Sequence, residues 1–530
     1  MEKIMKKTKN TLKEVKNKSW MYFLMRRRIV TILLLAIQLA FIIYLIFSSS
    51  LLSSTIALFL NALSVIVCIH IVNKSEKSSF KLAWVFMIMA FPLFGGMLYL
   101  FFMTQKSLRR FKEKYSENER EIGPLFFKNG DCLEKAVKDC PESAGRMRYL
   151  QNKCAFPVFS SSECEYFPSG VKKLERLKEE LEKAEKYIFI EYFIICGGKM
   201  WSEIFDILVR KAAEGIKVRI IYDDIGSFFF LPSNYPKILA SYGIECMVFN
   251  KFRPFLTTAS NNRDHRKIVS VDGKVAFTGG INISDEYIGE IEKHGRWKDS
   301  AVMIKGDGAW SLTLIFLEMW QICCAEKRCP FKADEDLTVF YPGKSDIEHQ
   351  GYVQHYADSP LDREYVGENV YTSIISSSQK YLYITTPYLI VDDAMTESLV
   401  YAAKRGVDVR IITPEIGDHW YVHTTTRSYY HDLISNGVRI FEYKDGFCHA
   451  KLFVSDDAVA TVGTVNLDYR SLYHHFECGC CFMDEKVIED VKRDFFDTEN
   501  ESREIKAQDC KRGFFISVIQ TLLRLMAPLM

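Results

Sequence analysis

The chain has 530 residues, 48% of them hydrophobic, and its 69 Lys and Arg against 67 Asp and Glu leave a net charge of only +2. This length gives room for two or more domains with an extensive core, and the near balance of charge argues against the basic field that non-specific nucleic-acid binding requires. The 15 cysteines are scattered along a long chain. They therefore favour free thiols in a reducing compartment over a disulfide-stapled secreted scaffold.

Apolar residues concentrate near the N-terminus. A Lys-rich segment, residues 1–28, comes first, and we interpret it as a topological signal near anionic lipid. Stretches without Asp, Glu, Lys or Arg then follow at Ile29–Phe47, Leu51–Val72 and Leu82–Phe102. Helices of this length approach the roughly 30 Å hydrocarbon core of a bilayer. The sequence therefore predicts an N-terminal α-helical membrane anchor over residues 29–102, and a multi-pass protein of the cell membrane.

The charge pattern allows more than one topology for this anchor. Basic residues precede the first stretch, separate the second from the third and follow the third, and full crossings cannot place all of them on one side. Pro92 and Gly95-Gly96 interrupt the third stretch. We expect two spans plus a third apolar segment that is re-entrant or interfacial, with three full spans as the alternative. The part of the chain that follows the anchor is expected to face the cytoplasm.

The rest of the chain contains an internal duplication. After a predicted linker, residues 103–165, the segment Gly215–Gly226 corresponds to Gly406–Gly417 in a second half. In each half, short β-branched and aromatic runs alternate with helical stretches, which is typical of an α/β fold with a helix-covered sheet. We predict two such domains, residues 166–330 and 350–500.

The most informative repeat is a His-x-Lys pair with an Asp five residues after the Lys. It occurs as His265-Arg-Lys267-Ile-Val-Ser-Val-Asp272 and as His449-Ala-Lys451-Leu-Phe-Val-Ser-Asp456. Each copy runs on through a glycine to an asparagine, Asn282 or Asn466. Chance gives one such match in only roughly a few per hundred chains of this length. Two copies with the same continuation therefore indicate a site built twice.

Each copy has the pattern of a β-hairpin. Residues 265–272 predict a strand, Asp272-Gly273 predicts a tight turn, and residues 274–278 predict the returning strand. His and Lys two residues apart point to the same face of a strand. If the two halves pack about a pseudo-twofold axis, two His, two Lys and two Asn surround one cleft.

Such a cleft suits a phosphodiester. The ammonium and amide groups of its Lys and Asn residues donate hydrogen bonds to the non-bridging oxygens and to the charge of the transition state. One imidazole can attack phosphorus, while the other protonates the leaving alkoxide and then activates the acceptor. The lysines supply the positive charge, so we expect neither a metal nor a cofactor.

The carboxylates near the motifs have two expected kinds of role. Each imidazole needs an acceptor that fixes its tautomer, and Glu477 and Asp299 are the candidates. Asp272 and Asp456 belong to the motif and are included as catalytic candidates. Asp at a hairpin turn is also favoured for local backbone reasons, so a structural or supporting role stays open for both.

These residues resemble the paired HKD motifs of the phospholipase D superfamily, and the chain is similar to bacterial cardiolipin synthases over nearly all of its length. The similarity extends to Phe91–Tyr99, Thr386-Pro387-Tyr388 and Asn466–Ser471. The resemblance implies duplicated phospholipase D-like domains with mixed sheets flanked by helices. It also implies transfer of a phosphatidyl group between two phosphatidylglycerols through a phosphohistidine, giving cardiolipin and glycerol. His265 is then the nucleophile and His449 the acid and base, although the symmetry of the sequence alone allows the reverse.

The expected partners are phosphatidylglycerol and membrane phospholipids, with neither nucleic acid nor an obligate protein partner. The alternatives are a membrane-anchored phospholipase D that uses water or other alcohols, a membrane-tethered nuclease, and an inactive lipid-binding scaffold. Near-neutral charge counts against the nuclease, and the intact His–Lys pairs count against the scaffold. Residues 501–530 predict an amphipathic tail that packs on the catalytic domains or contacts anionic headgroups. Cys478–Cys481 alternates like a strand and lacks zinc-finger spacing, so we predict no metal site there.

Overall fold

The computed structural model describes residues 51–91, 95–96, 99, 106–129, 132–251, 262–324, 331, 335–348, 351–483 and 485–529. The predicted basic segment 1–28 and the first apolar stretch, Ile29–Phe47, lie outside the described residues. The chain folds as two compact units. The first comprises residues 1–111, 252–261 and 521–530, and the second comprises residues 112–251 and 262–520.

The first unit contains two apolar helices, α2 (Leu51–Val72) and α3 (Ser78–Ala90). Cys68 and Ile71 of α2 pack with Ile88 of α3 in a small buried cluster. Helix α3 ends two residues before Pro92, which cannot continue a helix without losing a hydrogen bond. No helix in the described part of the chain combines the length and hydropathy of a membrane span. The predicted anchor is therefore not shown by the structure.

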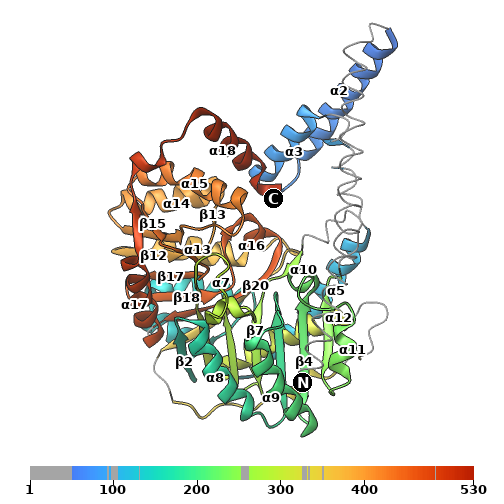
Figure 1. Ribbon diagram of the computed structural model, residues 1–530, viewed down its shortest axis with the longest axis vertical. Coiled ribbons are helices and arrows are strands. Elements are labelled where there is room, and N and C mark those ends of the chain that lie inside the picture. The colour runs from blue at the N-terminus through green and yellow to red at the C-terminus, as the bar shows by residue number, and fades with distance from the viewer. Residues whose placement is uncertain are drawn as a thin grey trace. The chain divides into compact units, whose positions relative to one another are not determined.

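The second unit holds one mixed sheet for each half of the chain (Figure 1). The strands of the first sheet lie in the order β2 (Ser162–Phe167), β10 (Ala301–Gly306), β8 (Val275–Gly279), β7 (Lys267–Val271), β3 (Tyr187–Tyr192), β4 (Lys217–Asp223) and β5 (Glu245–Phe249). Strands β3, β4 and β5 are parallel, and the other neighbours are antiparallel.

The second sheet repeats this order and these directions. Its strands are β11 (Tyr352–Asp358), β20 (His475–Met483), β18 (Val459–Gly463), β17 (Leu452–Ser455), β12 (Tyr381–Thr385), β14 (Asp408–Pro414) and β15 (Arg439–Tyr443). Strands β12, β14 and β15 are parallel, and the other neighbours are antiparallel. This correspondence confirms the predicted duplication of α/β domains.

Segments predicted to lie outside the two domains extend this second sheet. The predicted linker, residues 103–165, forms α5 (Lys106–Phe126), α6 (Leu133–Asp139), α7 (Ala144–Asn152) and β1 (Val158–Phe159), and it supplies the first residues of β2. Strand β1 pairs with β11, and β21 (Ser502–Ile505) of the predicted tail pairs with β15. The tail then continues into α18 (Phe514–Met526), where Phe514 and Phe515 are 77% and 80% exposed.

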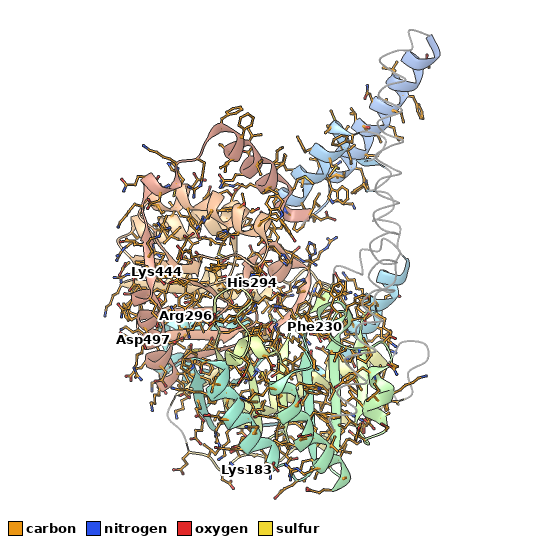
Figure 2. The ribbon with its side chains drawn as sticks, in the orientation of Figure 1. Lys183, Phe230, His294, Arg296, Lys444 and Asp497 are labelled. Carbon is orange, nitrogen blue, oxygen red and sulfur yellow. The ribbon has the colours of Figure 1, made fainter. Side chains whose placement is uncertain are left out.

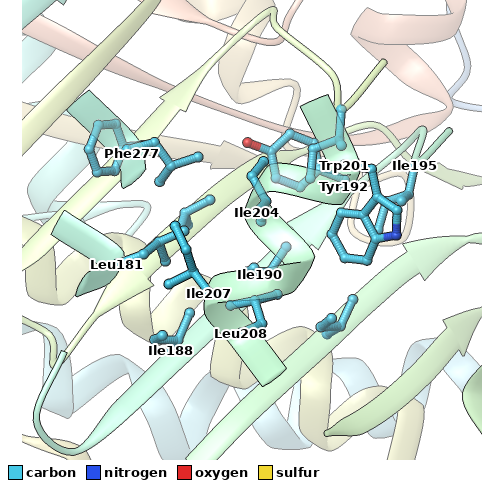
Figure 3. Close-up of a cluster of buried hydrophobic side chains, with 14 of the residues drawn as sticks. Leu181, Ile188, Ile190, Tyr192, Ile195, Trp201, Ile204, Ile207, Leu208 and Phe277 are labelled. Atoms are coloured by element: carbon cyan, nitrogen blue, oxygen red, sulfur yellow. The ribbon is translucent and has the colours of Figure 1, made fainter. Parts of the chain in front are cut away.

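Helices α8 (Gly170–Glu182) and α9 (Lys199–Ala213) lie side by side against the first sheet (Figure 1). Apolar residues recur along α9 with the helical period of 3.6, and they pack against every second residue of β3, which has the strand period of 2. The cluster includes Ile188, Ile190, Tyr192, Trp201, Ile204, Ile207, Leu208 and Phe277 (Figure 3). Val269 and Val271 of β7 belong to the same cluster, so this packing supports β3 and β7 from one face.

Helix α12 (Asp307–Cys324) is almost fully buried and contacts strands of both sheets, including β8, β10 and β11. It therefore ties the two halves together within the second unit. The helices of the second half are α13 (Val366–Ser377), α14 (Asp393–Lys404), α15 (Trp420–Ser435), α16 (Tyr469–Tyr473) and α17 (Lys486–Asn500). The first half also contains two short helices, α10 (Asp224–Ser227) and α11 (Tyr235–Ala240).

Candidate active site

Each His-x-Lys motif lies at the start of a β-hairpin, as predicted. Strand β7 pairs with β8, and β17 pairs with β18, both antiparallel. Asp272 and Gly273 have φ of 53° and 66°, and Asp456 and Asp457 both have φ of 56°. Two consecutive residues with positive φ form the turn that matches the twist of a hairpin, and Asp tolerates this conformation better than most residues.

The motif aspartates act on the backbone at these turns. Asp272 accepts hydrogen bonds from the backbone amides of residues 185, 186 and 187, each at 2.8 Å. Asp456 accepts from the amides of residues 379, 380 and 381 at 2.6–2.9 Å. Each carboxylate thus fixes the start of the neighbouring strand, β3 or β12, and contacts neither motif histidine. Because main-chain donors already engage their acceptor oxygens, these contacts favour the structural role that was one of the two expected for Asp272 and Asp456.

Two short parallel ladders join the halves at equivalent places. Strand β6 (Arg263–Asp264), which leads into His265, pairs with the start of β20. Strand β16 (Gly446–Cys448), which leads into His449, pairs with β9 (Arg296–Lys298). The backbone amide of each histidine continues its ladder and donates to a carbonyl of the other half, at 2.9 and 2.7 Å. Each ladder has the same place in its half, as a pseudo-twofold relation requires.

These ladders place each histidine beside a carboxylate of the opposite half. Nδ1 of His265 lies 3.0 Å from both oxygens of Glu477, and Nδ1 of His449 lies 2.7 Å from Oδ2 of Asp299. A carboxylate only accepts, so each Nδ1 carries the ring proton and each Nε2 keeps its lone pair. Both predicted acceptors therefore lie beside the motif histidines, and each histidine contacts the acceptor that belongs to the other half.

Glu477 is itself held by two hydroxyl groups. Thr464 donates to its Oε2 at 2.5 Å, and Ser471 donates to its Oε1 at 2.6 Å. Glu477 is fully buried. Its orientation is therefore fixed before any substrate arrives.

Asp299 is positioned differently. Its Oδ1 accepts from the backbone amide of Ser300 at 2.7 Å, and it lies against Gly280. A Cβ at Gly280 would stand 2.1 Å from Oδ1 of Asp299. The position equivalent to Gly280 in the second half is Thr464, so one half leaves room for a carboxylate where the other supplies a hydroxyl.

The motif lysines lie on the same face as their histidines and are buried. Nζ of Lys267 donates to the backbone carbonyl of His265 at 2.5 Å, and Nζ of Lys451 donates to the carbonyl of His449. Nζ of Lys451 also lies 2.9 Å from Nδ1 of His449. This arrangement presents both ammonium groups beside the imidazoles.

The four groups influence one another electrostatically. Burial, together with the charges of Lys267, Lys451 and His449, holds the pKa of His265 well below its ordinary value. Burial and the charge of Lys451 lower the pKa of His449 to about 4. Burial lowers the pKa of Lys267 to about 7 and that of Lys451 to about 8. Both imidazoles are therefore neutral at pH 7, and both lysines titrate near neutrality.

The asparagines differ in their contacts. Asn282 accepts from the amide of Ile194 at 3.1 Å and donates to the hydroxyl of Tyr287 at 2.8 Å, so it is partly engaged within the protein. The Oδ1 atom of Asn466 is buried and has no hydrogen-bond partner. The hydroxyl of Tyr287 lies 3.5 Å from Nδ1 of His449, which links Asn282 to the site.

Comparison with known proteins identifies the family. The family model described as "Cardiolipin synthase, PLD-like domain" matches residues 177–307 and 371–498, and the model "Phospholipase_D-nuclease N-terminal" matches residues 62–102. A cardiolipin synthase of Alkalihalophilus pseudofirmus is 32% identical over 452 residues, which cover 85% of this chain and 88% of the relative. The chain belongs to the cardiolipin synthase family of the phospholipase D superfamily. An uncharacterised protein of Streptococcus mutans serotype c is 41% identical over 463 residues, 87% of this chain and 99% of the relative.

A solved structure shares the fold of the cardiolipin synthase family seen here. A phosphatidylserine synthase of Haemophilus influenzae Rd KW20 superposes with a TM-score of 0.55 at 15% sequence identity, and the match covers 72% of this chain and 97% of that chain. At this identity the likeness concerns the fold alone.

Aromatic rings surround His449. The ring of His449 contacts Phe447, Trp297 and Tyr287 at centroid distances of 5.7, 5.7 and 6.0 Å. His294, labelled in Figure 2, contacts Trp297 and also Phe447 of the other half. These rings restrict the access of water to one imidazole.

Sequence reasoning missed several residues of the site. Lys173 of α8 is buried, its Nζ donates to the hydroxyl of Tyr192 at 2.7 Å, and burial lowers its pKa to about 7. Its position on the apolar face of α8, four residues before Leu177, was the available signal. Ser471 ends the similar segment Asn466–Ser471, but the role of Thr464 and Ser471 could not be inferred from the sequence, because it depends on where Glu477 lies.

Proposed function

We propose that the protein is a cardiolipin synthase, which transfers a phosphatidyl group from one phosphatidylglycerol to a second and releases glycerol. The observation that carries the proposal is the pair of equivalent contacts, His265 with Glu477 and His449 with Asp299, in a chain of this family. Exchange of one phosphodiester for another is close to isoenergetic, so the reaction needs no nucleotide. Phosphatidylglycerol therefore serves as both donor and acceptor.

In the first step, Nε2 of His265 attacks phosphorus. Glu477 accepts a hydrogen bond from the Nδ1–H group, so the lone pair stays on Nε2, and its negative charge stabilises the positive charge that develops on the ring. The N–P bond forms, the P–O bond to the glycerol headgroup breaks, and His449 gives a proton to the departing oxygen. The products are a phosphatidyl-histidine and free glycerol.

His449 obtains this proton when the substrate binds. In the free protein, burial and the charge of Lys451 lower its pKa to about 4. A phosphodiester anion between the two motif lysines offsets their positive charge. Its arrival therefore raises the pKa of His449 and also favours the charged form of Lys267 and Lys451. Binding of the anion and uptake of a proton are thus linked.

The second step reverses the first with a new alcohol. His449, now neutral, accepts a proton from the glycerol hydroxyl of a second phosphatidylglycerol, and the oxygen attacks the phosphatidyl-histidine. The P–O bond forms and the N–P bond breaks, which releases cardiolipin and restores His265. The aromatic rings around His449 favour a lipid acceptor over water.

We further infer that the protein works at a membrane. The substrate is a lipid, and α2 exposes apolar side chains such as Leu58 and Phe59, at 72% and 67%. The expected arrangement remains two spans with a third re-entrant or interfacial segment, and a cytoplasmic active site. Alkaline carbonate extraction, followed by protease protection in oriented vesicles, tests both points, since release of the chain by carbonate would exclude a spanning anchor.

The deciding assay for the function is reconstitution with phosphatidylglycerol as the sole lipid, without added metal or nucleotide, followed by mass spectrometry. The proposal predicts cardiolipin and an equal amount of free glycerol. Phosphatidic acid without cardiolipin would identify water as the acceptor and the protein as a phospholipase D. No turnover under these conditions would contradict the proposed donor.

A further inference from the structure

We propose that the first-motif histidine belongs to an inhibitory site for a divalent transition metal, with zinc as the best-fitting ion. Its ligands are Nδ1 of His265, Nδ1 of His475 and a carboxylate oxygen of Glu477. Each of these three side chains offers one ligand atom, and the three atoms all lie within 4.8 Å of one another. The inhibitory effect rests on the proposed function, whereas the binding of the metal does not.

The spacing of the ligand atoms fits a tetrahedral ion. Metal–ligand bonds of about 2.1 Å place tetrahedral ligands about 3.4 Å apart. Nδ1 of His265 is 3.0 Å from Glu477, and Nδ1 of His475 is 3.6 Å from Oε1 of Glu477. Two imidazoles and one carboxylate form the ligand set of many zinc sites that keep a fourth position open. Small rotations of the two rings therefore suffice to close the site.

Among the described residues, the ring nitrogens of His475 make few contacts. Its side chain is only 10% exposed, and Nδ1 is buried without a hydrogen-bond partner. Its other ring nitrogen meets Nε of Arg470 at 3.4 Å, near the limit for a hydrogen bond. Moving the ring proton from Nδ1 to Nε2 therefore gives up one weak contact and frees Nδ1 for a metal.

Metal binding and catalysis exclude each other at His265. The proposed reaction needs the proton on Nδ1 and the lone pair on Nε2. A metal on Nδ1 of the neutral ring leaves the proton on Nε2, where no lone pair remains to attack phosphorus. The same metal also takes Glu477 away from its orienting contact. No bond of the lipid is made or broken in this process, and removal of the metal restores the original tautomer.

The second motif lacks a third metal ligand, although it has an equivalent histidine–carboxylate pair. Nδ1 of His449 has Asp299 at 2.7 Å, but its next neighbour is the ammonium of Lys451 at 2.9 Å instead of a third ligand. Among the described residues, no second group of three metal-ligating side chains meets the same distance condition. The nearby positive charges of Lys267 and Lys451 oppose a cation. This opposition favours reversible inhibition over a permanently bound ion.

The test combines direct binding with inhibition. Zinc chloride alone is titrated into the purified full chain in detergent, binding is followed by calorimetry, and X-ray absorption reports the ligands of the bound ion. Transfer is measured over the same zinc range, before and after addition of EDTA. His475→Asn removes one ligand, and His474→Asn is the matched control because it changes the adjacent imidazole and leaves all three ligand atoms in place.

We expect one bound zinc ion with two imidazole ligands, and inhibition that EDTA reverses. The zinc concentration that halves the uninhibited rate of each variant should be roughly tenfold or more higher for His475→Asn than for the unmodified chain. His474→Asn should match the unmodified chain. Equal zinc sensitivity in His475→Asn, or an absorption spectrum with fewer than two imidazoles, would overturn the site. If the chain binds zinc with two imidazoles but transfers no lipid at all, the metal site stands and the proposed function fails.

Discussion

The substitution Glu477→Gln removes the charge that supports the attacking imidazole. The glutamine side chain has nearly the same shape, and its carbonyl oxygen can still accept a hydrogen bond from Nδ1 of His265, which lies 3.0 Å from Oε1 of Glu477. What is lost is the negative charge facing a ring that becomes positive as the N–P bond forms. Two unit charges about 4 Å apart, at an effective dielectric constant of about 20, attract by about 4 kcal/mol. Since each 1.36 kcal/mol is tenfold in rate, we expect kcat to fall about 1,000-fold.

A matched control separates this effect from loss of stability. Glu442 of β15 is also a fully buried carboxylate, and it accepts from Arg427 and from the hydroxyl of Tyr430. Glu442→Gln should lower the melting temperature and leave the turnover of the folded protein unchanged. Both variants are assayed for cardiolipin formation and by thermal unfolding. A fall in kcat of less than about tenfold in Glu477→Gln would refute the charge argument.

Further substitutions and the pH profile test the remaining parts of the site. His265→Ala and His449→Ala should each abolish transfer with folding and membrane association intact, and most of the activity remaining in either would contradict a two-histidine mechanism. Gly280→Ala places a Cβ 2.1 Å from the carboxylate that orients His449, so we expect kcat to fall about 100-fold, and an unchanged kcat would show that this carboxylate can shift freely. The pKa of Lys267 is about 7 and that of Lys451 about 8, and the charged form exists below the pKa. The value of kcat/KM should therefore decline as pH rises through 7–8, and a flat profile to pH 9 would contradict the role of the lysines.

The local structure of the site could be predicted from the sequence because short-range rules determine it. A period of two placed His265 and Lys267 on one face, and Asp272-Gly273 identified the turn between β7 and β8. The duplication could be predicted because both halves repeat the same spacing. Glu477 and Asp299 could be named as acceptors, since each follows its motif at a comparable place in its half.

The pairing of these carboxylates could not be predicted in the same way. His265 and Glu477 are 212 residues apart, and His449 and Asp299 are 150 apart. Their contact depends on the two ladders between the halves, and short strands with no hydrophobic period of their own give no signal in the sequence. The role of Asp272 could not be predicted for a related reason, because a turn aspartate has the same sequence pattern whether it binds the backbone or a substrate.

The covalent intermediate is the most direct test of the central claim. The protein is mixed briefly with phosphatidylglycerol, denatured at alkaline pH, where phosphohistidine survives, and digested for peptide mass spectrometry. We expect a phosphatidyl adduct on His265 that forms as glycerol is released and disappears as cardiolipin appears. An adduct on His449, or cardiolipin formed with no adduct at any time, would contradict the central claim.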